Sequence, residues 1–396
     1  MTQHASPPLL PDPAPPARGR LHHVDNLRVA LTVLVVLHHV ALTYGNIPVW
    51  FYLEPAQDPS GGLLDLFVFL NQTYFMGLFF LLAGYFVPGA ADRRGGRGLV
   101  RERLVRLGAP FLLFVLLVRP FLMIPNYGPA VEMFAAEGGE LPFWLFLIVT
   151  YDPGPMWFVE VLLVMTLAYV AVRSLRERRA RQTGAAVAPP ARPADTAPLR
   201  WAVPVAALTL GLALVTFAWR YLAPAPYWPI VGLPSPGFLP QYVTLFVLGV
   251  LAYRGNWLVR LPGAAGWWGA ALALTGLAAG AAVTVLLGEI TPASGTWQAL
   301  AQITSESVLA TGAMLMLLVG FRRFASGSNR LTRWLSDNAF AVYVLHPLVL
   351  VGLGVALSGW EASALVKFLG MGALAVPACW ALATAVRAVP GARRIL

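Results

Sequence analysis

The sequence predicts an all-α, polytopic integral membrane protein. Hydrophobic residues make up 58% of its 396 residues and charged residues only 12%, against about 25% charged in an ordinary soluble domain. Several apolar runs reach or approach the ~20 residues that cross a bilayer as a helix. The basic residues, which give a net charge of +10, are confined to alternate connections between these runs.

The apolar runs predict ten transmembrane helices in one membrane domain. Residues 1–24 read as a disordered cytoplasmic tail, 25–172 as a first helix group and 173–200 as a cytoplasmic linker rich in Arg, Ala and Pro. A second helix group fills 201–387, and 388–396 form a cytoplasmic tail. The expected helices lie at about 25–45, 63–87, 109–124, 154–172, 201–222, 237–253, 266–287, 298–320, 337–357 and 363–386.

Local signals predict helix ends and interruptions. Asp25 or Asn26 suits the N-cap of the first helix, and Asp337 suits that of the ninth. The dipeptide Arg119-Pro120 interrupts the third helix. The apolar piece Phe143–Val149 is too short to span a bilayer, which predicts a re-entrant or interfacial segment.

The placement of the arginines predicts the orientation. The tails and the segments 89–106, 173–200, 254–260 and 322–333 hold nearly all Lys and Arg, and the intervening connections hold essentially none. Cytoplasmic loops carry this excess, so both termini are expected in the cytoplasm, in an inner membrane. Cys379, the only cysteine, excludes a disulfide framework. The histidine spacing indicates no metal site, and no basic motif interleaved with aromatics indicates nucleic acid.

The first predicted helix carries ionisable residues that lipid would not tolerate. Arg28 and His39 are eleven residues apart, about three turns, so they share one face roughly 16 Å apart along the axis. His38 lies about 100° off that face, as a packing neighbour. Charges within a membrane helix face the protein interior or a wet cavity, so this stripe predicts a functional site.

The motifs, in order, resemble the membrane-bound acyltransferase-3 family. The Arg28-to-His39 spacing is similar to its first-helix pattern, and Arg103-x-x-Arg106 to its Arg-x-x-Arg motif. Phe79-Phe80-Leu81-Leu82-Ala83-Gly84-Tyr85 resembles its FF-x-x-S-G-Y segment, with Ala83 in place of the usual serine. Gly154-Pro155-Met156-Trp157-Phe158 resembles its fourth-helix motif G-x-x-W-F, and the stretch from Ser336 to Pro347, which contains Phe340, Tyr343 and His346, resembles its late motif.

The resemblance implies transfer of an acyl group, acetyl or succinyl, from cytoplasmic acyl-CoA to a hydroxyl of a glycan or lipid-linked sugar at the outer side of the membrane. Such transfer needs a base at the acceptor hydroxyl and a cation for the thioester oxyanion. His39 is the expected base, Glu160 the group that orients its ring, and Arg28 a further catalytic and donor-binding residue. Arg103 and Arg106, at i and i+3, would clamp coenzyme A phosphates together with Arg28.

Further polar and aromatic residues at the depth of His39 are candidate acceptor or oxyanion contacts. They are Asn71, Arg119, Trp157, Glu306 and His346. Trp50, Tyr52, Tyr227 and Trp228 suit either sugar stacking or interfacial anchoring. We also expect a continuous polar cavity that runs from the cytoplasm past Arg28 to His39.

Each assignment has a structural alternative. Arg103 and Arg106 suit retention of their loop inside the cell, and His346 suits satisfaction of carbonyls freed by Pro347. Glu160, Glu306 and Arg119 suit ion pairs with one another. At the level of function, buried Arg, His and Glu also suit a proton-coupled transporter or an exporter, although no inverted repeat is evident.

Overall fold

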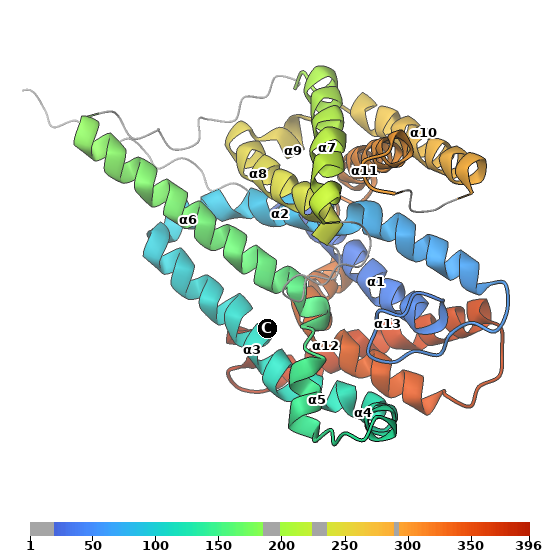
Figure 1. Cartoon of the computed structure of the whole chain (residues 1–396). Helices are drawn as coiled ribbons and strands as arrows, with labels where there is room; N and C mark the ends of the chain where they lie inside the picture. The colour runs from blue at the N-terminus through green and yellow to red at the C-terminus, as the bar shows by residue number, and fades with distance from the viewer. Residues whose placement is uncertain (1–19, 185–198, 224–235, 289–292) are drawn as a thin grey trace, which may run out of the picture.

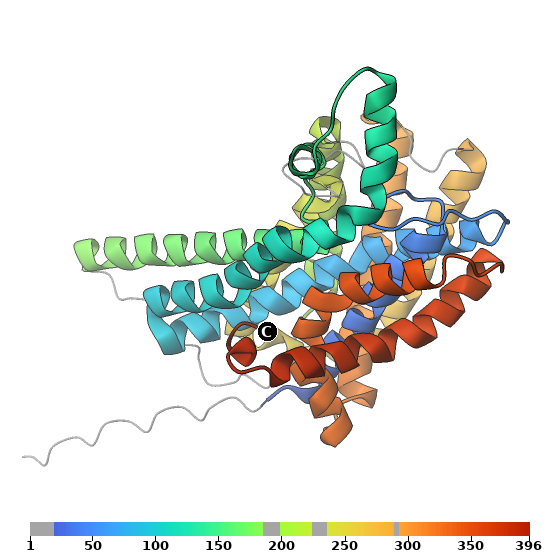
Figure 2. The same cartoon turned by 90° about the horizontal axis from the view of Figure 1, so that it is seen from below.

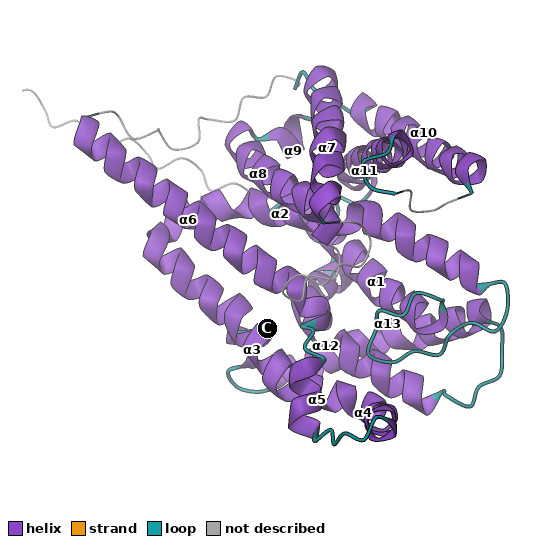
Figure 3. Cartoon of the chain, in the orientation of Figure 1, coloured by secondary structure: helices purple, strands orange, loops and turns teal. Residues whose placement is uncertain are grey.

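The chain is entirely helical in its regular structure, over the residues that the computed structural model describes: 20–184, 199–223, 236–288 and 293–396 (Figure 3). The long helices are α1 (His22–Tyr44), α2 (Gly61–Arg103), α4 (Arg119–Ala136), α6 (Trp157–Thr183), α7 (Ala202–Leu222), α8 (Leu239–Gly255), α10 (Ala264–Leu287), α11 (Trp297–Phe324), α12 (Arg330–Ala356) and α13 (Ala364–Ala388). The short ones are α3 (Ala109–Leu113), α5 (Phe143–Val149) and α9 (Trp257–Arg260).

Nine helical segments within the described ranges are long and apolar enough to cross a membrane. The second, Gly61–Ala136, contains 76 residues, about 114 Å of helix at 1.5 Å per residue, whereas a bilayer core is about 30 Å thick. Gly95 interrupts it with a φ of 70°, and the chain turns back there (Figure 1). Counting the two arms separately raises nine to the ten helices predicted from the sequence.

The helix starts differ from the sequence prediction at two N-caps. The N-cap position of α1 is Leu21, so Asp25 and Asn26 lie in the first turns; Asn26 instead donates to the carbonyls of Ala325 and Gly327. The prediction of an N-cap at Asp337 was also wrong. A capping box at Asn329 and Thr332 starts α12 two turns earlier, because these side chains satisfy the orphan N–H groups there.

The two arms of the second segment and α6 form a long projection from the bundle. Figures 1 and 2 both show α6 running beside the reversal at Gly95. Helix α6 extends to Thr183, past the expected end at 172, and finishes at Gly184 with a φ of 64°. An ion pair between Arg173 of α6 and Asp92 of α2 fastens it, and Glu177, one turn later in α6, also contacts Arg173. The α5 segment, Phe143–Val149, has the predicted bounds.

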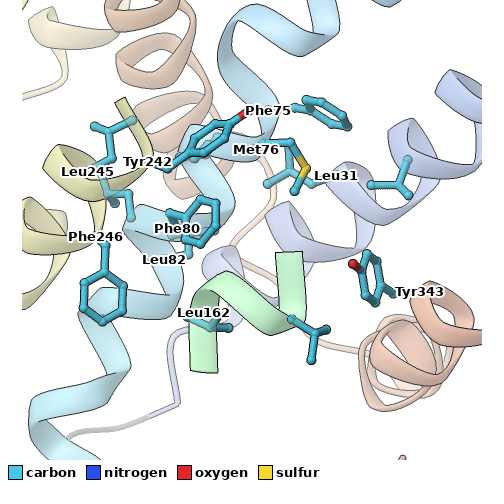
Figure 4. Close-up of a cluster of buried hydrophobic side chains, with 14 of the residues drawn as sticks. Leu31, Phe75, Met76, Phe80, Leu82, Leu162, Tyr242, Leu245, Phe246 and Tyr343 are labelled. Atoms are coloured by element: carbon cyan, nitrogen blue, oxygen red, sulfur yellow. The ribbon is translucent and has the colours of Figure 1, made fainter. Parts of the chain in front are cut away.

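Helices α2 and α8 cross closely at two glycines in the core. A Cβ on Gly84 would lie 2.2 Å from the carbonyl oxygen of Phe246, and one on Gly249 would lie 2.1 Å from that of Leu81. Small residues let membrane helices approach in this way. Around the crossing, Phe80, Tyr242 and Leu245 pack into the buried cluster drawn in Figure 4.

The connection between α1 and α2 is fixed to the start of α13. Glu54 pairs with Lys367, Asp58 accepts from the backbone N–H of Ala364, and the hydroxyl of Ser60 accepts from the N–H of Leu365. Hydrogen bonds from Ser60 and Ala364 lower the pKa of Asp58. These bonds hold the loop 45–60 against the C-terminal end of α1, where it contributes to the site.

Candidate functional site

His39 has a defined tautomer in the structure. Its Nδ1 lies 2.8 Å from the backbone carbonyl oxygen of Val35, one turn earlier in α1. Because a carbonyl oxygen only accepts, Nδ1 carries the proton and Nε2 carries the lone pair. Nε2 makes no hydrogen bond with the described part of the chain, so it is free to accept a proton.

His346 is held next to His39 by the same kind of bond. Pro347 has no N–H, so the carbonyl of Tyr343, four residues earlier, loses its helical partner. Nδ1 of His346 lies 2.7 Å from that oxygen and replaces the missing donor. The ring is fully buried, and its Nε2 has no partner among the described residues. The rings of His39 and His346 lie 5.0 Å apart between centroids.

Trp50 packs over this histidine pair. Its ring lies 4.1 Å from that of His39 and 6.0 Å from that of His346, between centroids. The loop 45–60, fixed to α13 as described above, sets its position. The indole Nε1 is buried and has no hydrogen-bond partner among the described residues. Trp50 therefore places an unpaired N–H donor next to the two histidines.

His38 faces the neighbouring helix. Its ring stacks on Phe75 of α2 at 5.0 Å, and its Nδ1 has no partner in the described ranges. His38 also lines the cavity that His39 lines. The sequence analysis described His38 as a packing neighbour of His39, and its ring does pack against α2.

A cavity of about 1170 Å³, which we call the central cavity, opens beside His39. It lies between residues of α1, α2, α6, α7, α10, α11 and α12 and the loops that join them. Trp157 and Glu306, both expected contacts, line it. Other polar residues that line it include Asp65, Gln72, Asn126, Thr150, Asp152, Arg220, Thr284, Ser294, Gln302 and Ser305. The mixture of polar groups and aromatic rings suits a ligand-binding site.

Asp152 is the carboxylate that the α5–α6 loop contributes to this cavity. It accepts a hydrogen bond from the backbone N–H of Gly154 at 2.8 Å. Burial nevertheless raises the pKa of its carboxyl above the usual range. The side chain is thus more easily protonated than an ordinary aspartate.

The expected passage from His39 to Arg28 is not part of the central cavity. Val35 is the residue of α1 nearest to Arg28 in sequence that lines it. Leu31 lies between Arg28 and Val35, and its side chain is only 1% exposed and packed in the core. Apolar packing therefore fills the stripe that the sequence analysis assigned to a polar route.

Arg28, Arg103 and Arg106 form an arginine cluster at the opposite end of α1. Their guanidinium groups are close enough to repel one another, and attraction of Arg103 to Glu102 and of Arg28 to Asp25 offsets part of this repulsion. Arg28 has a distant ion pair with Asp25, at 3.9 Å, and its side chain is 41% exposed. Arg103 Nε is buried without a partner among the described residues. A repelling, incompletely paired cluster of this kind suits an anion.

Arg119 has a structural role rather than the predicted one. Its guanidinium donates to the carbonyls of Asp152 at 2.9 Å and Leu147 at 3.1 Å, and to that of Thr150. It therefore satisfies the carbonyls left open where α5 ends. Arg119 is buried and does not line the central cavity, so the assignment as an oxyanion or acceptor contact is corrected.

We expect Arg119→Ala to lower the free energy of unfolding by about 2–4 kcal/mol, because several buried carbonyls lose charged donors. Thermal denaturation in detergent measures this, and Arg119→Lys, which keeps the charge but loses the planar fork, should lie between. A stable Arg119→Ala protein with weakened acceptor binding would restore the sequence-based assignment.

Glu160 and Asn71 also lie apart from the reactive face. The backbone carbonyl of Val35, not Glu160, holds Nδ1 of His39, because a helix presents that carbonyl one turn away. Neither Glu160 nor Asn71 lines the central cavity. Asn71 accepts from the hydroxyl of Tyr74 at 3.3 Å. The expectation that Glu160 orients the imidazole is therefore corrected.

Sequence reasoning missed Arg220 and Gln302. Arg220 of α7 pairs with Glu306 of α11 at 2.7 Å, and both side chains are 9% exposed. The sequence analysis had expected Glu306 to pair with Arg119 if its role was structural. An arginine inside the apolar run 201–222 is the signal that would have identified Arg220. Tyr227 and Trp228, expected at the outer face, lie outside the described residues.

The comparison with protein families decides the assignment. A sequence model of the acyltransferase 3 family, described as an acyltransferase domain, matches residues 21–384. The chain belongs to the acyltransferase 3 family. No curated protein and no solved structure matches it. Together with its apolar helices, membership of the acyltransferase 3 family makes this protein a multi-pass membrane acyltransferase.

Proposed function

We propose that the protein transfers an acetyl or succinyl group from cytoplasmic acyl-CoA to a hydroxyl of a glycan or lipid-linked sugar at the outer side of the inner membrane. The observation that carries the proposal is the 2.8 Å contact between Nδ1 of His39 and the carbonyl oxygen of Val35, which assigns the tautomer of the ring. Its Nδ1–H donates to Val35, which leaves the Nε2 lone pair available in a residue that lines the central cavity. A base in this state is what hydroxyl activation requires.

The proposed reaction assigns a proton path to His39. Nε2 accepts the proton of the acceptor hydroxyl while the hydroxyl oxygen attacks the carbonyl carbon of the thioester. As the tetrahedral intermediate collapses, the new ester C–O bond remains and the C–S bond breaks. The imidazolium then gives its proton to the leaving thiolate, so that neutral His39 is restored. Trp50 Nε1, a free donor on the ring that covers His39, is our candidate to stabilise the oxyanion.

The arginine cluster is the proposed site for the coenzyme A phosphates. Its three members lie at the end of the bundle that the positive-inside rule places in the cytoplasm. Phosphate oxygens would relieve the repulsion among Arg28, Arg103 and Arg106 and supply Arg103 Nε with an acceptor. Because the buried side chain of Leu31 lies between the cluster and His39, the thioester arm can reach His39 only if this side chain is displaced.

Purified protein in detergent, incubated with radiolabelled acetyl-CoA or succinyl-CoA, tests the donor. We expect slow hydrolysis or acyl exchange, and faster consumption when a hydroxyl acceptor is added. Analysis of lipids and cell-wall glycans from a deletion strain then identifies the missing ester. Protein that neither binds nor consumes acyl-CoA, but moves a solute in response to a pH gradient, would favour the alternative of a proton-coupled transporter or exporter.

The His39–His346 contact gives a prediction about His346. In His346→Asn, the amide Nδ2–H can still donate to the carbonyl of Tyr343, but the Nε2 lone pair is lost. If that lone pair assists proton transfer, His346→Asn should fold normally and lose roughly 10-fold or more in kcat, with KM for the donor unchanged.

His346→Ala is the matched variant, because it loses the carbonyl bond as well. We expect a lower melting temperature for His346→Ala in addition to slow turnover. Full activity of His346→Asn, with loss in His346→Ala only, would show that the ring serves only the carbonyl that Pro347 frees.

A further inference from the structure

The central cavity contains a second polar centre, formed by Arg220, Glu306 and Gln302. Nη2 of Arg220 donates to Oε2 of Glu306 at 2.7 Å, and Nε donates to the carbonyl of Gly237 at 3.3 Å. Phe238 packs under the guanidinium, with its ring centroid 4.8 Å from Cζ. The hydroxyl of Ser294 donates to the backbone carbonyl of Arg220 at 3.0 Å. This end of α7 is therefore held in place by bonds to three other segments.

Gln302 brings to this centre an acceptor that no described residue satisfies. It is 5% exposed, it lines the cavity, and its Oε1 has no hydrogen-bond partner among the described residues. A buried amide oxygen without a donor is costly in a folded protein. It lies one turn before Glu306 on α11, so the two side chains share a face. Both present acceptor oxygens, while Arg220 presents donors.

The charges identify the class of ligand. Arg220 and Glu306 neutralise each other, so an added carboxylate or phosphate would lack a counter-charge in a buried place. The amide oxygen of Gln302 requires a donor, which a hydroxyl has and a carboxylate lacks. Trp157, which also lines the cavity, offers an aromatic ring against which the apolar side of a sugar ring packs. An uncharged sugar ring, with its hydroxyl groups and its apolar face, satisfies each of these requirements.

We infer that Arg220, Glu306 and Gln302 form a subsite for an uncharged sugar ring, and that it selects neutral over acidic acceptors. The inference rests on the proposed function in that the ring belongs to the acyl acceptor. Hydroxyls of the ring donate to Gln302 and Glu306 and accept from Arg220. The acceptor is thereby held in the cavity that His39 lines, with one hydroxyl left for acylation.

Binding is tested without any acyl donor. Purified protein in detergent is titrated with neutral methyl hexosides and the corresponding methyl hexuronides at a pH where the latter are ionised, and tryptophan fluorescence is followed. We expect the wild type to bind the best hexoside at least about tenfold more tightly than its hexuronide. Gln302→Ala should weaken hexoside binding about tenfold, the effect of one lost hydrogen bond and one unfilled acceptor position.

A charge change provides the sharper test. Glu306→Gln keeps the shape but leaves Arg220 without its counter-ion, so we expect the preference to invert in favour of the hexuronide. Arg220→Gln/Glu306→Gln removes both charges, and it should retain the neutral preference. The double variant also keeps the test valid if an unpaired Arg220 prevents folding of the single variant.

Equal or tighter binding of hexuronides by the wild type, or unchanged hexoside binding by Gln302→Ala, would overturn the inference. So would the absence of saturable binding for every hexoside. The proposed transferase activity fails separately, because it is measured by acyl-CoA consumption. Selective hexoside binding without acyl-CoA turnover would retain the subsite and reject the donor.

Discussion

Replacing His39 with alanine is expected to reduce acyl transfer by roughly 10²–10⁴-fold. The variant loses the Nε2 lone pair that accepts the hydroxyl proton in the proposed reaction. It should still fold, because the bond from Nδ1 to Val35 lies within α1 and the carbonyl freed by its loss keeps its ordinary helical partner. Initial rates with labelled acyl-CoA and acceptor, together with melting temperature in detergent, measure both expectations.

His38→Ala is the matched control for His39→Ala. The two histidines are adjacent in sequence and both line the central cavity, but His38 is stacked on Phe75 of α2. We expect His38→Ala to keep most of its turnover and to lose some stability through this packing. Equal loss of turnover in both variants would place the reactive face of α1 elsewhere, and normal transfer by folded His39→Ala would exclude His39 as the base.

Hydropathy was sufficient to predict the helices because a bilayer sets their length. A run of about 20 apolar residues has one way to satisfy its backbone in lipid, which is to form a helix. The bounds of α7, α8 and α10 therefore follow closely from the apolar runs. Helix starts outside such runs follow local bonding, as at Asn329 and Thr332, which compete with Asp337 as caps. The orientation of the bundle remains a prediction.

The sequence could relate only those candidate residues that share one helix, and their roles in catalysis remain predictions. Arg28 and His39 lie on α1, so their spacing alone placed them on one face. The partners of Arg119 and Glu306 were not predictable, because those contacts join segments far apart in the chain. Arg119 caps the end of α5, and Glu306 pairs with an arginine 86 residues away. Spacing within one helix carries no information about which helices become neighbours.

The route from the arginine cluster to His39 was mispredicted for a related reason. Because Arg28 and His39 share one face of α1, the whole face between them was assumed to be polar. In the structure, the two polar ends of α1 are separated by Leu31, which is buried in the core. A passage through packed apolar side chains is a property of the whole bundle and of its motions.

Arg103→Ala is expected to raise the apparent KM for acyl-CoA by roughly 10–100-fold, the effect of one lost charge-assisted bond to phosphate. Arg106→Ala should have the smaller effect. Arg106 lies 3.9 Å from Glu102 and its side chain is 50% exposed, so its charge is partly neutralised and screened. Arg103 has a buried Nε with no partner in the described part of the chain. KM for the acceptor should change little in either variant.

Stability separates this donor role from retention of the loop by positive charge. Because Arg28, Arg103 and Arg106 repel one another, removing Arg103 should leave the melting temperature of donor-free protein unchanged or raise it. The stabilisation of the wild type by added coenzyme A should shrink in the variant, since ligand binding to the folded state underlies it. Arg101→Ala, at an exposed position two residues earlier, is the control for general loss of positive charge. If Arg101→Ala and Arg103→Ala weaken donor binding equally, the arginines act only through overall charge and the proposed phosphate clamp is wrong.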